Sequence, residues 1–146
     1  MKIPPGARRG EFNMLCTLVT RVAEIADLDY QKRVWLEGKG PEVSSYSDAM
    51  LSILDDVEYV YGDLRLRYWM TREQTEILEV FRDRLQLFQN KVRLMDFKGD
   101  DLEIVSDPEW PSLVALASKA TAMCRDWRAE NCGCDGYALA NFDLYE

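Results

Sequence analysis

Apolar residues recur at three- and four-residue steps along four segments of the chain, which is the spacing of one face of an α-helix. The first segment runs from about Glu11 to Asp27, and its apolar positions are Phe12, Leu15, Cys16, Val19, Val22, Ala23 and Ala26. The second begins near Ser45 or Ser47 and ends near Gly62, and its apolar positions are Tyr46, Met50, Ile53, Leu54, Val57, Val60 and Tyr61. The pattern predicts two helices, each buried along one side.

The third segment opens with Thr71 and Gln74 in a capping-box arrangement and continues to about Met95. Its main apolar positions are Ile77, Leu78, Phe81, Leu85, Phe88, Val92 and Met95. A second apolar flank repeats every seven residues and consists of Val80, Leu87 and Leu94. Two apolar flanks predict a central helix that packs against neighbours on both sides. The alternative is a seam through which the chain forms a homodimer.

The fourth segment starts at Asp107-Pro108-Glu109, an N-cap, a first-turn proline and an acid, and ends near Gly133. Strand-like alternation is weak, and Leu102 to Val105 is the single short candidate. A short turn over Tyr30 to Leu36 precedes the loop Gly38 to Pro41, whose glycines and proline disfavour a helix. We therefore predict an all-α, single-domain bundle of about four helices over residues 1–146, with an irregular Gly/Pro loop after the first helix.

No stretch of the sequence approaches the roughly 18 apolar residues that a membrane span requires, and the first residues lack the apolar centre of a secretory signal. The expected location is therefore the cytoplasm. In that reducing compartment we expect the four cysteines, Cys16, Cys124, Cys132 and Cys134, to be thiols, and the last three to be structural.

The chain carries 18 Lys and Arg against 26 Asp and Glu, a formal net charge of −8. This charge opposes binding to nucleic acids and anionic membranes and favours a basic protein partner. The chain has no histidine, so the usual general base, the commonest zinc ligand and every Ser-His or Cys-His pair are absent. We therefore expect a binding protein without catalytic residues or a cofactor.

One face of the second helix is acidic and lies opposite the apolar face. Between Lys39 and Arg65 the sequence has six acids and no Lys or Arg, so the stretch contains no cations of its own. An acidic face can simply be solvated. The alternative is a surface for a cationic partner, with an aromatic anchor among the acids. The candidate partner-binding residues are Asp48, Asp55, Asp56, Tyr59 and Asp63, together with Trp35 and Glu37 beside the glycine loop.

Two other clusters have the composition of a metal site but not its spacing. The acids between Asp96 and Glu109 do not follow the alternating order of a calcium-binding EF-hand loop. The pair Cys132 and Cys134 has one residue between its members where a zinc knuckle has two, and a redox function is disfavoured by the acid that follows. We expect no metal site.

The stretch from Tyr30 to Pro41, continuing through Ser44-Ser45-Tyr46 to Leu54-Asp55-Asp56, resembles a group of small, uncharacterised bacterial helical proteins. The small size, acidic charge, single helical domain and missing catalytic residues are also similar to those of immunity proteins of bacterial toxin systems, including contact-dependent growth inhibition. That resemblance implies a cytosolic protein that binds a cognate, often cationic nuclease toxin and covers its active surface. The competing hypothesis is a regulatory or adaptor module that binds an ordinary cellular protein.

Overall fold

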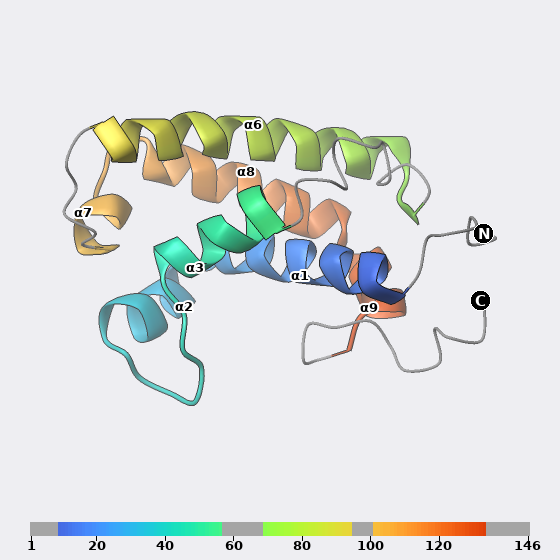
Figure 1. Ribbon diagram of the computed structural model, residues 1–146, viewed down its shortest axis with the longest axis horizontal. Coiled ribbons are helices and arrows are strands. Elements are labelled where there is room, and N and C mark those ends of the chain that lie inside the picture. Colours follow the sequence, from blue (N-terminus) through green and yellow to red (C-terminus); the bar gives the residue numbers. More distant parts are fainter. Residues whose placement is uncertain (1–8, 57–68, 95–100, 134–146) are drawn as a thin grey trace.

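The computed structural model describes residues 9–56, 69–94 and 101–133, and these form a single all-α domain without a β-strand (Figure 1). Three long helices form its frame: α1 (Arg9–Ile25), α6 (Arg72–Leu94) and α8 (Trp110–Met123). Helix α8 packs against both α1 and α6 and lies between them in Figure 1. The predicted all-α class is thus confirmed, and the described residues also contain several short helices that the sequence did not separate.

The segment after α1 turns back on the bundle through two short helical units. Helix α2 (Leu28–Tyr30), capped by the Asp27 carboxylate, runs directly into the π-helix η1 (Gln31–Leu36). The expected Gly/Pro loop follows, and Gly38 and Gly40 have φ angles of 64° and 96°, which side chains rarely adopt. Helix α3 (Tyr46–Met50) then begins at Ser45 and continues as the π-helix η2 (Leu51–Asp56). Together these units cover one side of α1 (Figure 1).

The capping box predicted for the third helix is present at the start of α6. The Thr71 Oγ1 accepts the backbone N–H of Gln74 at 3.2 Å, and Gln74 Oε1 accepts the backbone N–H of Thr71 at 2.9 Å. The predicted fourth helix is divided at Cys124 into α8 and α9 (Arg125–Asn131). The strand candidate Leu102 to Val105 is wrong, because these residues belong to helix α7 (Asp101–Val105).

An aromatic cluster fills the core between α6, α8 and the segment from η1 to α3. Trp110 lies at its centre, with ring centroids 5.5 Å from Phe88, 5.9 Å from Tyr46 and 6.1 Å from Trp35. Edge-on and tilted contacts of this kind add to the stabilisation that burial alone provides. The cluster thus joins four elements that are distant in sequence.

The second apolar flank of α6 does not pack within the described part of the chain. Val80, Leu87 and Leu94 are 49%, 66% and 85% exposed, whereas the main stripe of α6 is buried. The prediction that α6 packs on two sides is therefore wrong. Helix α6 lies at the edge of the bundle, with α8 along one side (Figure 1). The homodimer interpretation of this flank stays a prediction.

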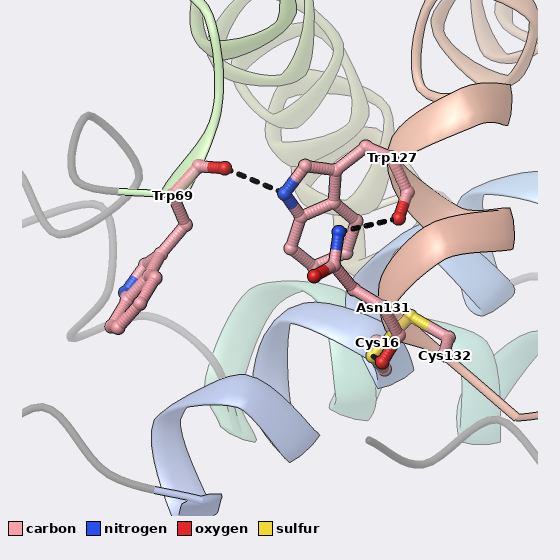
Figure 2. Close-up of a disulfide and its surroundings, with 5 residues drawn as sticks. All are labelled: Cys16, Trp69, Trp127, Asn131 and Cys132. Carbon is pink, nitrogen blue, oxygen red and sulfur yellow. Dashed lines mark hydrogen bonds between the residues drawn. A yellow bond between two sulfur atoms is a disulfide. The ribbon is translucent and has the colours of Figure 1, made fainter. Parts of the chain in front are cut away.

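Cys16 and Cys132 form a disulfide, which corrects the expectation that these cysteines are thiols. Their Cα atoms are 5.7 Å apart, and the bond joins α1 to the residue that follows α9 (Figure 2). Beside it, the Trp127 indole N–H donates to the Trp69 carbonyl at 2.6 Å. Cys124 remains a buried thiol, and burial raises its pKa to about 11, which disfavours the reactive thiolate form.

The Lys91 ammonium joins α6 to the turn before α8 by an ion pair with Asp107. The Nζ atom donates to Asp107 Oδ1 at 2.9 Å, and the same oxygen accepts the backbone N–H of Glu109. Burial alone would raise the pKa of Asp107, but the hydrogen bonds from Lys91 and Glu109 outweigh it and lower that pKa. The carboxylate therefore stabilises the fold in its charged form.

None of the helices in the described residues is long and apolar enough to cross a membrane.

The disulfide closes a loop across 116 positions of sequence, so its loss should lower stability strongly. We expect the double variant Cys16→Ala, Cys132→Ala to lose about 2–5 kcal/mol of unfolding free energy, because its unfolded chain gains conformational freedom. Guanidinium unfolding without reductant measures this. A reductant should shift the midpoint of the wild-type chain and leave that of the double variant unchanged. Equal midpoints for the two chains would contradict the prediction.

The lowered pKa of Asp107 predicts an acid-sensitive contribution to stability. Its folded pKa lies below its unfolded value of about 3.9, so the stabilisation is complete above that pH and is lost as pH falls through the folded pKa. We expect Asp107→Asn to be less stable at pH 7 and to lose less stability between pH 5 and pH 2. Thermal unfolding across this range tests it, with the exposed Asp83→Asn as the control that should keep the wild-type slope.

Candidate functional site

The acidic face predicted for the second helix begins at α3, where Ser45 and Asp48 define the start of the helix. The Ser45 hydroxyl accepts the backbone N–H of Asp48 at 3.2 Å, which fixes the first turn. The Asp48 carboxylate is exposed, and within the described residues it forms no ion pair. A negative charge in the first turn of a helix interacts favourably with the helix dipole, so this position suits an acidic side chain.

A second acid approaches the same helix start from a distant part of the sequence. The Asp101 carboxylate, at the beginning of α7, accepts the backbone N–H of Tyr46 at 3.2 Å. The two acidic stretches of the sequence, 42–63 and 96–109, therefore meet in space at the first turn of α3. We call the pair Asp48 and Asp101 the acidic corner. The Tyr46 phenol beneath it is buried, which raises its pKa, and it donates to Gln89 Oε1 at 2.5 Å.

Two other acids near the loop are neutralised by basic residues outside or at the edge of the acidic stretch. Arg33, from η1, forms an ion pair with Glu42 through both Nη atoms. This hydrogen bond lowers the pKa of Glu42 and raises that of Arg33. Lys39 Nζ lies 3.2 Å from Glu37 Oε2, and the Lys39 side chain is 71% exposed. The absence of basic residues between Lys39 and Arg65 therefore does not leave every acid unpaired.

Trp35, a candidate binding anchor, is 8% exposed and belongs to the core. Its indole N–H donates to Glu24 Oε1 at 2.7 Å, and the other oxygen of that carboxylate accepts from Arg21 at 2.8 Å. The Ser44 hydroxyl donates to Glu24 as well and accepts from Arg21 at 2.9 Å. This network holds the end of the loop against α1. Trp35 therefore positions the loop, and it is too buried to act as an exposed binding anchor.

The remaining candidates lie partly or wholly beyond the described part of the chain. Asp55 and Asp56 end η2, and only their backbone is described. Tyr59 and Asp63 fall outside the described residues. The structure therefore brings together Asp48 and a residue that was not predicted, Asp101, and it places Glu37 on the neighbouring loop. The sequence signal for Asp101 is its position in the second acidic stretch, whose order of acids does not fit a calcium-binding loop.

The chemistry of the acidic corner is that of an exposed anion. Among the described residues no cluster of three or more His, Cys, Asp or Glu side chains is arranged to hold a metal ion. The exposed carboxylate of Asp48 can attract and pair with cationic groups at the surface.

No family model, curated protein or solved structure matches this chain.

The contact between Trp35 and Glu24 can be tested by a change that keeps the aromatic bulk. Trp35→Phe leaves a buried carboxylate oxygen without its indole donor, so we expect a loss of about 1–3 kcal/mol in unfolding free energy. Urea unfolding measures it. A second variant, Trp127→Phe, removes the indole hydrogen bond to the Trp69 carbonyl and should lower the unfolding free energy by a similar amount. If Trp35→Phe left stability unchanged, the indole bond would contribute nothing to the fold.

Proposed function

We propose that this chain is a binding protein that inhibits a basic protein toxin, in the manner of bacterial immunity proteins. The observation that carries the proposal is the exposed carboxylate of Asp48 at the acidic corner, which no basic residue in the described part of the chain neutralises, in a chain of net charge −8. A cationic enzyme that binds phosphates presents the complementary charge. An acidic surface increases the rate of encounter with such an enzyme and can occupy its substrate groove without any reaction.

The geometry of the corner supports a rigid contact surface. Ser45 caps α3, and Asp101 holds the Tyr46 backbone from a second helix, so the carboxylates are positioned before a partner arrives. Positioning in advance lowers the entropy that is lost on binding. Asp55, Asp56, Tyr59 and Asp63 remain part of the proposed surface, since they continue the same acidic stretch of sequence.

A regulatory or adaptor module is the second candidate function. The exposed apolar flank of α6, with Leu87 at 66% exposure, favours it, because an adaptor binds through apolar surface more than through charge. The two functions differ in their response to salt. Inhibition through the acidic corner weakens as ionic strength rises, whereas binding through an apolar flank does not.

The place of action is the cytoplasm in this proposal, but the Cys16–Cys132 disulfide is unusual for a compartment that keeps thiols reduced. Alkylation of free thiols in intact producing cells distinguishes a cytoplasmic protein with reduced cysteines from a protein in an oxidising compartment. Blocked thiols at both positions favour the cytoplasm, and an intact disulfide excludes it.

The function can be tested by capturing the partner from the producing cell and expressing it alone. We expect one dominant basic protein that is toxic by itself and harmless when this chain is co-expressed. Asp48→Lys should weaken the complex by about tenfold, because it replaces an attraction with a repulsion. Titration calorimetry at two salt concentrations measures the affinity.

The matched control is Asp126→Lys, which reverses an exposed acid in the first turn of α9. It changes the net charge equally and should leave the affinity near the wild-type value. Equal losses for both variants would mean that only total charge matters. A captured partner that is harmless when expressed alone would exclude toxin inhibition.

A further inference from the structure

A cavity of about 360 Å³ lies along the first two turns of α6, away from the acidic corner. Four residues on one face of α6 and one residue just before the helix line it: Arg72, Thr75, Glu76 and Glu79, and Met70. The volume falls within the range of small-ligand sites. The start of α6 is held firmly, because the capping box closes it and Gln74 Nε2 donates to the Met123 carbonyl at the end of α8 at 3.0 Å.

Thr75 is a buried polar residue in this lining whose hydroxyl is unsatisfied. The side chain is 2% exposed, and its Oγ1 has no hydrogen-bond partner among the residues that the structure describes. Its backbone N–H is used by the helix, in a 2.9 Å bond to the Thr71 carbonyl. A buried hydroxyl without a partner costs roughly 1–3 kcal/mol relative to a satisfied one. The fold thus carries a polar group at the cavity that a ligand could satisfy.

The charges of the lining favour a cation. Arg72 Nε donates to Glu76 Oε1 at 3.0 Å, so these two side chains neutralise each other. Glu79, one turn further along the same face, forms no ion pair within the described residues. The described lining residues therefore carry one excess negative charge, on Glu79, near the Thr75 hydroxyl, while Met70 contributes an apolar surface. An anion would be repelled by Glu79, and a purely apolar ligand would leave both polar groups unsatisfied.

We propose that this cavity binds a guanidinium or primary ammonium group carried on an aliphatic chain. The cation pairs with the Glu79 carboxylate, one of its N–H groups donates to Thr75 Oγ1, and its methylene chain packs against Met70. The same chemistry is found in an arginine or lysine side chain of a partner protein and in free arginine or a diamine. The site does not depend on the proposed function, because it involves no residue of the acidic corner.

The cavity can be tested by titrating the full chain with N-acetyl-arginine amide while following the ¹³C-methyl signals of Met70 and Thr75. We expect saturable shifts of these two signals, with a dissociation constant in the millimolar range. The citrulline analogue has the same shape without the charge, and it should bind at least about tenfold more weakly. Equal binding of the two probes, or no shift at Met70 and Thr75, would overturn the proposal.

Two variants separate the site from general attraction to an acidic protein. Glu79→Gln should weaken binding about tenfold, whereas Glu73→Gln, an exposed acid on the same helix outside the lining, should not change it. If both variants weakened binding equally, the probe would be attracted only by net charge, and the site would be excluded.

Thr75→Val keeps the shape of the side chain and removes the hydroxyl. We expect it to weaken binding of the probe severalfold while the unfolding midpoint of the free chain stays level or rises, because no hydrogen bond is lost in the free protein. Unchanged affinity would remove Thr75 from the site. Free arginine and putrescine distinguish the source of the cation: tighter binding than the blocked arginine indicates a free small molecule, and equal or weaker binding indicates a protein side chain.

Discussion

The buried amide of Gln31 is the contact on which the arrangement of this bundle depends. Its Nε2 donates to the Glu24 and Ile25 carbonyls at the end of α1, at 3.0 and 2.9 Å, and its Oε1 accepts the Trp110 indole N–H at 3.0 Å. The end of a helix leaves carbonyl groups without partners, and burying them unsatisfied would be costly. One side chain satisfies two of these carbonyls together with the indole at the centre of the core. It thereby fixes the turn from α1 into η1 against the start of α8.

The hydrogen bonds of the Glu24 carboxylate hold the surface loop in the same way, by satisfying buried polar groups. The backbone of Glu24 is held by Gln31, and its carboxylate holds Trp35, Ser44 and Arg21. A buried carboxylate is stable only when its oxygens are fully hydrogen-bonded, so the loop between η1 and α3 is tied down at both ends. Because Ser44 directly precedes Ser45, the N-cap of α3, this buried network also positions Asp48 at the acidic corner. The position of the candidate binding surface therefore depends on buried polar contacts in the core.

The end of the molecule that contains α9 and the start of α6 is held by a disulfide and an indole hydrogen bond. The Cys16–Cys132 disulfide and the bond from Trp127 to the Trp69 carbonyl join α1, α9 and the start of α6 (Figure 2). The cavity beside Thr75 opens at this end. The disulfide and the capping box of α6 hold this end by contacts that do not involve Gln31 or Glu24. The two candidate sites thus lie on parts of the fold whose geometry is fixed independently.

The sequence by itself determined the helical class, the capping box at Thr71 and Gln74, a helix start at Ser45 or Ser47 and the glycine loop. Each of these follows from local spacing and backbone preference, which act over a few residues. Only the tertiary structure decided that Cys16 meets Cys132, that Asp101 reaches the start of α3, that Trp35 is buried and that the Leu87 flank is exposed. These facts depend on how distant segments pack, because an apolar or acidic residue has the same local pattern whether a neighbour covers it or not.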